Sequence, residues 1–158
     1  MKRNENESNA TAVIKRLDEQ HQKYRFMELN LMQKKRRLKK QIPDIKSSLD
    51  VLKLVKTKRD SKEEMVTNYM LSDQVFTDAK VAPTDKICLW LGANVMLEYT
   101  LDEANELLSK NLDTASKNLA QIDVDLDYLR DQITTTEVNM ARVYNWDVKR
   151  RQMEKQQP

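Results

Sequence analysis

The sequence predicts a mostly α-helical protein, built as a long antiparallel two-helix coiled coil with two β-hairpins at the end where the helices connect. Three observations lead to this fold class. Two long segments carry apolar residues at seven-residue spacing, a segment with strand and turn signals separates them, and the two helical segments have opposite net charge. With 158 residues, the chain has room for one domain or one extended element.

Residues 10–68 are expected to form one long helix that follows a disordered N-terminus at residues 1–9. The segment contains no glycine, and its only proline is Pro43. An unbroken row of apolar residues recurs at every seventh position: Leu17, Tyr24, Leu31, Leu38, Ile45 and Leu52. A second row, offset by three or four residues, is half polar. This narrow stripe is typical of a coiled coil and not of the broad apolar face of a globular helix.

Residues 69–100 have a different chemistry and predict four short strands in two hairpins. β-branched and aromatic residues occur in short runs, and Pro83-Thr84-Asp85 and Gly92-Ala93-Asn94 interrupt these runs as turns. The second hairpin, residues 87–99, carries apolar side chains on both faces. Four short strands beside a slender helix pair cannot cover such faces, so we expect the hairpins to need cover from other chains. Cys88 is interpreted as a small core residue of this hairpin.

Residues 101–152 are expected to form the second helix, followed by a disordered tail at residues 153–158. Thr100 and Glu103 have the spacing of a capping box that fixes the start of the helix. Two heptad rows follow, and only one of their twelve positions is polar. The first row is Leu101, Leu108, Ala115, Ile122, Leu129, Thr136 and Val143, and the second is Leu112, Leu119, Leu126, Ile133 and Met140.

The charge distribution predicts that the two helices pair with each other. Residues 23–62 hold 14 Lys and Arg against 4 Asp and Glu, whereas residues 101–147 hold 4 against 10. If the hairpins reverse the chain, the basic and acidic helices face each other across an antiparallel seam. With the reversal placed near residues 66 and 101, the numbers of facing residues should add up to about 167. Leu31 is then expected near Thr136.

The composition argues against an enzyme and against a cofactor. The single glycine cannot supply the two glycines of a phosphate-binding loop or the three of a dinucleotide fingerprint. One cysteine and one histidine cannot build an ordinary zinc site. No apolar run approaches the roughly 18 residues of a membrane span. We therefore expect no catalytic residues, no metal, no cofactor and no membrane partner.

The basic run at residues 34–40 leaves an alternative open. A helical basic region followed by heptads resembles a zipper-type DNA binder, but the heptad stripe continues through this run. We interpret the run as a solvated face that pairs with the acidic helix, and we expect no nucleic-acid partner. A coiled-coil scaffold or tethering subunit is the second alternative, since it would share the heptads.

Four long runs resemble the alpha-type subunits of eukaryotic prefoldin. They are residues 23–31 (KYRFMELNL), 34–53 (KKRRLKKQIPDIKSSLDVLK), 83–99 (PTDKICLWLGANVMLEY) and 129–151 (LRDQITTTEVNMARVYNWDVKRR). The resemblance implies a heterohexamer with one further alpha-type and four beta-type subunits, in which the hairpins join into a double β-barrel. It also implies a cytoplasmic, ATP-independent co-chaperone that captures unfolded or nascent actin and tubulin at the coiled-coil tips. The captured chains would then pass to the cytosolic group II chaperonin.

The same resemblance assigns residues to two surfaces. Oligomerisation would fall to strand residues Val75, Phe76, Val81, Ile87, Leu89, Trp90, Leu91, Val95 and Leu97. Client binding would fall to residues near the helix ends, namely Val13, Ile14, Leu17, Val143, Tyr144, Trp146 and Met153.

Overall fold

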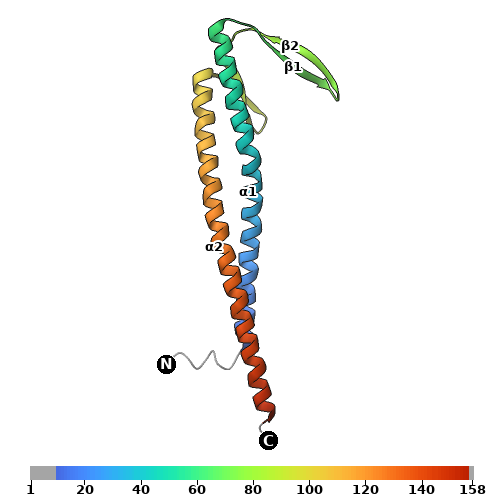
Figure 1. Ribbon diagram of the computed structural model, residues 1–158, viewed down its shortest axis with the longest axis vertical. Coiled ribbons are helices and arrows are strands. Elements are labelled where there is room, and N and C mark those ends of the chain that lie inside the picture. The colour runs from blue at the N-terminus through green and yellow to red at the C-terminus, as the bar shows by residue number, and fades with distance from the viewer. Residues whose placement is uncertain (1–9, 157–158) are drawn as a thin grey trace. The chain divides into compact units, whose positions relative to one another are not determined.

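The computed structural model describes residues 10–156. It consists of two long helices with four strands between them in sequence (Figure 1). The elements are α1 (Ala10–Ser61), β1 (Met65–Ser72), β2 (Val75–Val81), β3 (Lys86–Gly92), β4 (Val95–Thr100) and α2 (Leu101–Gln156). The strands form two separate antiparallel hairpins, β1–β2 and β3–β4. The predicted fold class is confirmed, whereas the disorder predicted for residues 1–9 and 157–158 lies outside the described residues.

The chain divides into two compact units, and each contains part of both helices. The helix-end unit holds the described residues of 10–37 and 119–156, and the hairpin unit holds residues 38–118. In the helix-end unit the buried apolar residues of α2 are Ile122, Leu126, Leu129 and Ile133. All four belong to the predicted heptad rows, so this part of the seam is read correctly from the sequence.

Two ion pairs define the register of the helix-end unit. His21 Nε2 lies 2.9 Å from Glu137 Oε1, and Lys35 Nζ lies 2.6 Å from Asp123 Oδ1. The residue numbers in each pair add up to 158, so α1 and α2 run antiparallel here. The predicted sum of about 167 is wrong by more than two helical turns. Leu31 shares a groove with Leu129 and not with Thr136. The error arises mainly because α1 ends well before residue 66.

We expect a cysteine crosslink to follow the observed register. In a Cys88→Ser background, Leu31→Cys with Leu129→Cys should be joined within one chain by a short bis-maleimide, because both positions line the same groove. Leu31→Cys with Thr136→Cys is the matched control and should react poorly, since seven further residues of helix span about 10 Å. Digestion and mass spectrometry of the linked peptides checks the result. Preferential linkage of the 31/136 pair would contradict the register.

In the hairpin unit, α1 ends in a Schellman motif without a glycine. The N–H of Lys62 donates to the carbonyl of Arg59 and the N–H of Glu63 donates to the carbonyl of Lys58, both at 3.1 Å. Lys62 takes the left-handed conformation with φ of 57°. The helix therefore stops at Ser61, and residues 65–68, which were predicted to be helical, belong to β1. No glycine or proline marks this stop in the sequence.

Replacing Lys62 with glycine is expected to stabilise the chain by about 1 kcal/mol, because a side chain in the left-handed region costs about that much. The helix-stop hydrogen bonds use only backbone groups, so the substitution leaves them intact. Chemical unfolding followed by circular dichroism measures the change. Lys62→Ala is the control and should give no comparable gain, since alanine keeps the strained Cβ. Equal stability of the glycine and alanine variants would show that no strain is released.

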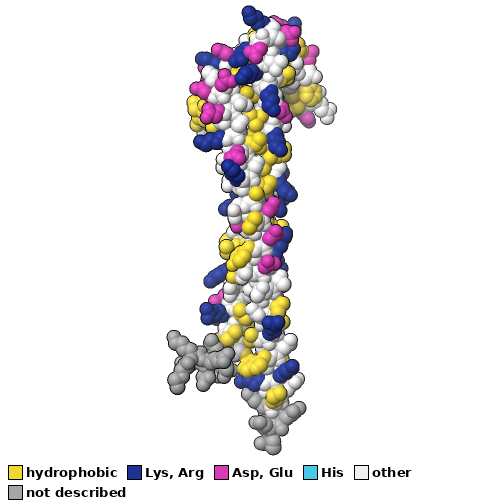
Figure 2. Space-filling model, turned by 60° about the vertical axis from the view of Figure 1, so that its left-hand side comes forward, with side chains coloured by type: hydrophobic (Ala, Val, Ile, Leu, Met, Phe, Trp, Pro, Cys, Tyr) yellow, Lys and Arg dark blue, Asp and Glu magenta, His cyan; other side chains and the backbone are white. Residues whose placement is uncertain are grey.

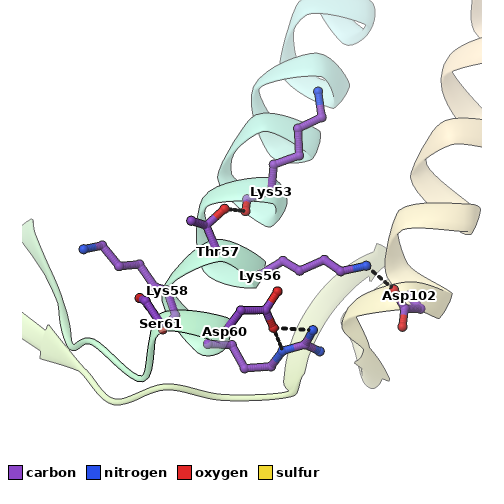
Figure 3. A network of polar contacts seen from close by, with 8 residues as sticks. Lys53, Lys56, Thr57, Lys58, Asp60, Ser61 and Asp102 are labelled. Carbon is purple, nitrogen blue, oxygen red and sulfur yellow. Dashed lines mark hydrogen bonds and ion pairs between the residues drawn. The ribbon is translucent and has the colours of Figure 1, made fainter.

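Polar contacts fix the helix ends in the hairpin unit (Figure 3). Lys56 Nζ donates to Asp102 Oδ1 at 2.8 Å and links α1 to the first turn of α2. The predicted capping box at the start of α2 is confirmed. Thr100 N and Thr100 Oγ1 lie 3.0 and 2.8 Å from Glu103 Oε2, and Glu103 N donates to Thr100 Oγ1 at 3.3 Å.

At its C-terminal end α2 continues to Gln156, so the tail predicted as disordered is helical over residues 153–156.

Candidate functional site

The strand register and the turn define the geometry of the second hairpin, β3–β4. Leu89 lies opposite Leu97 and Trp90 lies opposite Met96, and the register shifts at Leu91 before Gly92 pairs with Val95. Ala93 and Asn94 have φ values of 48° and 61°, which is the backbone of a type I′ turn. Gly92 has φ of 92°, a value that favours glycine. The turn predicted from Gly92-Ala93-Asn94 is confirmed. Leu89 and Trp90 point to opposite faces of the hairpin because they are consecutive residues of a strand.

The first hairpin has the same construction with a more polar middle. Tyr69 lies opposite Thr77 and Met70 lies opposite Phe76, and the register shifts at Leu71 before Ser72 pairs with Val75. Asn68 and Asp78 face each other nearer the base. Apolar side chains therefore lie at both ends of this hairpin, at its base around Met65 and Val81 and near its turn around Met70 and Phe76.

Exposed apolar side chains on the two hairpins form what we name the strand surface. Six of the predicted oligomerisation residues belong to it: Val75, Phe76, Trp90, Leu91, Val95 and Leu97. The sequence analysis missed five more, namely Val66, Tyr69, Met70, Leu71 and Met96. Val66 was hidden by the misplaced helix end, whereas the other four lie in the segment predicted to form strands, where their apolar character was a usable signal. Figure 2 shows hydrophobic side chains at the molecular surface among Lys, Arg, Asp and Glu side chains.

The other three predicted oligomerisation residues are half-buried within the chain. Val81 and Ile87 line a pocket of about 240 Å³ with Val55 at the end of α1. Leu89 is half-buried in the middle of β3. Because Val81 and Ile87 pack against the end of α1, most of the strand surface lies nearer the turns, although Val66 is exposed close to the base of the first hairpin. An isolated two-stranded hairpin is only marginally stable in water. An exposed apolar surface on such hairpins is therefore typical of a site that another protein covers.

The predicted client-binding residues fall into two groups by burial. Val13, Ile14, Leu17 and Val143 are half-buried, and the register places Ile14 opposite Tyr144. Tyr144, Trp146 and Met153 are exposed on α2, and we call these three the helix-end surface. The half-buried group closes the seam between the helices. The helix-end surface is the part of the predicted set that a partner can reach without separating them.

A buried carboxylate lies within the helix-end surface. Asp147 is 2% exposed, and it accepts a hydrogen bond from Arg150 Nη2 at 2.9 Å and another from Arg151. The Arg150 guanidinium carbon lies 5.7 Å from the centre of the Trp146 ring. The hydrogen bonds from Arg151 and Arg150 lower the pKa of Asp147 below its ordinary value. Sequence reasoning missed this cluster, although Asp147 and Arg150 extend the two heptad rows.

The residues of the basic run at 34–40 differ in burial and in pairing. Lys35 is half-buried and pairs with Asp123, whereas Lys34, Arg36 and Arg37 are exposed. In the hairpin unit Lys56 pairs with Asp102. Pairing of the basic helix with the acidic helix is therefore confirmed at these two positions, with Lys35 the member of the run that makes it.

Cys88 is exposed on β3, so its interpretation as a core residue is wrong. It lies opposite Glu98, whose carboxylate binds Lys86. Among residues 10–156, no group of three His, Cys, Asp or Glu side chains is arranged to hold a metal ion. Neither described helix has a stretch that is both long and apolar enough to cross a membrane.

Comparison with known proteins places this architecture in a family. Residues 24–146 match the family model described as prefoldin subunit. The chain belongs to this family of chaperone subunits, whose fold of two long helices and two antiparallel hairpins it shares.

Individual relatives narrow the comparison. The chain is 64% identical over 151 residues to prefoldin subunit 3 of Mus musculus, covering 96% of this chain and 76% of the relative. It is 56% identical over 152 residues to prefoldin subunit 3 of Drosophila melanogaster, with the same coverage. The fold is similar to a filamentous PFD from Methanocaldococcus jannaschii, solved by cryo-electron microscopy. The TM-score is 0.60 at 20% identity, over 77% of this chain and 98% of that one.

Proposed function

We propose that this chain is one of two alpha-type subunits in a heterohexameric co-chaperone that also contains four beta-type subunits. The observation that carries the proposal is the strand surface, because a lone chain leaves eleven large apolar side chains of its hairpins exposed. Its two hairpins per chain support the alpha-type assignment. Docking of the hairpins from sibling chains would remove this surface from water and pair the free strand edges.

The helix-end surface is the proposed site of client capture. Unfolded or nascent actin and tubulin would contact it through apolar segments before transfer to the cytosolic group II chaperonin. The proposed activity is binding and release without ATP and without catalysis, in the cytoplasm where that chaperonin acts. Tyr and Trp suit this task because they offer large apolar area with a polar edge, and flexible Met repacks against different shapes.

Magnitudes explain why the proposed activity requires a multivalent complex. Burying one apolar side chain is worth roughly 2 kcal/mol, so two at one helix end give about 4 kcal/mol. That free energy corresponds to a dissociation constant near 1 mM before association costs. Several helix ends on one platform raise the effective concentration and so the overall affinity. Each single contact stays weak enough to release the client.

The test uses the complex reconstituted with its sibling subunits and guanidinium-unfolded actin, without nucleotide. Tyr144→Ala with Trp146→Ala is expected to weaken actin capture by about tenfold or more, while native mass spectrometry shows an intact complex. Val124→Ala with Tyr128→Ala is the matched control, because both residues are also exposed on α2. Failure of the unmodified complex to suppress actin aggregation would favour the scaffold alternative. Dissociation of the Tyr144/Trp146 variant would show that these residues belong to the assembly interface.

A further inference from the structure

We propose that Asp147 is a positioning residue for the helix-end surface. Its hydrogen bond holds the Arg150 side chain close to the seam between the helices. The Arg150 guanidinium then packs on the Trp146 ring and keeps that ring outside the seam. This inference rests on the proposed client-binding role of Trp146. It adds a role for a buried acidic residue whose function the heptad pattern alone does not explain.

The first argument is the position of Asp147 and Arg150 in the heptad rows. One apolar row of α2 runs through Leu126, Ile133 and Met140, and Asp147 occupies its next position. The other row ends at Val143, and Arg150 occupies its next position. Both rows therefore change from apolar to charged within the same turn of helix. A polar layer of this kind sets the partner and register of a coiled coil at a cost in stability.

The second argument is the burial of the carboxylate. A buried charge without partners is costly, so its retention requires hydrogen bonds from charged donors. Arg150 and Arg151 supply them from one helical turn away, at the i,i+3 and i,i+4 spacings that place side chains on the same side of a helix. Because Asp147 is fixed by burial, the arginines that bind it lose rotational freedom.

The third argument is the contact of Arg150 with Trp146. A guanidinium within about 6 Å of an indole centroid is attracted by the ring face, and 5.7 Å meets this limit. Arg150 thus donates from its Nη2 to Asp147 while its guanidinium carbon lies over the Trp146 ring. Trp146 remains 47% exposed. The chain Asp147–Arg150–Trp146 lets a buried charge control the orientation of an exposed aromatic ring.

The test monitors Trp146 directly in the assembled complex. The chain has two tryptophans, so 5-fluorotryptophan incorporated only into this subunit gives two fluorine resonances. Trp146→Phe assigns them. Asp147→Asn keeps the shape of the side chain but removes its charge. It is expected to move the Trp146 resonance toward the value of a solvent-exposed ring and to leave the Trp90 resonance unchanged. Capture of guanidinium-unfolded actin should weaken by about two- to fivefold, the equivalent of one exposed cation–π contact.

Three further variants sharpen the result. Arg150→Gln should give the same shift, and it keeps the test open should Asp147→Asn impair folding. Asp147→Glu restores the charge and should recover both the resonance and most of the capture. Asp131→Asn, at an exposed position on the same helix, should change neither.

Failure of this inference is distinguishable from failure of the proposed function. A Trp146 resonance that stays in place in both Asp147→Asn and Arg150→Gln overturns the positioning role, as does a shift that leaves capture unchanged. Full capture by Trp146→Ala instead overturns the client-binding role of this residue, whatever its resonance does.

Discussion

The complex is expected to fail to assemble when Trp90 is replaced with aspartate. Trp90 is 60% exposed in the single chain, so the substitution removes little packing within the chain itself. In the proposed assembly the same position is covered by sibling subunits, and a carboxylate placed there is buried without a partner. Tryptophans at the centre of interfaces commonly contribute about 2 kcal/mol or more, which is a loss of about thirtyfold in association. Native mass spectrometry of the reconstituted mixture measures the assembled fraction.

Tyr128→Asp is the matched control for this prediction. Tyr128 is also 60% exposed and aromatic, but it belongs to α2 and the helix-end unit and not to either hairpin. The control complex should assemble normally, and circular dichroism should show equal helicity in both variants. Normal assembly of Trp90→Asp would contradict the assignment of the strand surface.

The second large effect is expected for Leu52→Ala. Leu52 is 3% exposed in the hairpin unit, where it belongs to the unbroken heptad row of α1. Truncation of a buried leucine to alanine removes apolar contact and leaves a cavity, at a cost of about 2–5 kcal/mol. Urea unfolding of the full chain, followed by circular dichroism of its helices, measures this loss.

Leu54→Ala supplies an internal comparison because it makes the same chemical change two residues away on the same helix. Leu54 is 47% exposed and stands outside the predicted heptad row. Its truncation should cost less than about 1 kcal/mol, since little apolar surface returns to water. Equal losses at the two positions would mean that the seam does not run through Leu52.

The sequence predicts the helical parts well because heptad spacing maps directly onto burial. Leu126, Leu129 and Ile133 are buried as their spacing requires, and the capping box at Thr100 forms as predicted. These features are local or periodic, so a single sequence contains enough information to find them.

The end of α1 and the helix register could not be read in the same way. Lys62 adopts the left-handed conformation that usually calls for glycine, and no residue type announces it. The predicted helix therefore ran into β1, which shifted the register and hid Val66 from the strand surface. An error of a few residues at one helix end moves every predicted contact between the helices.

The candidate sites also include residues that were predicted and features that were not. The family resemblance assigned Trp90 and Leu97 to an assembly surface, and both are exposed in the single chain. Exposure at the helix ends was not predictable, because it depends on the register between the helices, which leaves Ile14 half-buried and Tyr144 and Trp146 exposed. In the sequence, Asp147 indicates only that the apolar heptad row stops. The structure adds that its carboxylate is buried and bound by arginine side chains.

Sedimentation velocity of the purified chain, alone and mixed with sibling subunits, tests most directly whether the strand surface requires other chains. Alone, the chain is expected to self-associate as its concentration rises; with its siblings it should sediment as one discrete hetero-oligomer. A concentration-independent monomer that melts cooperatively and ignores the other subunits would contradict the account.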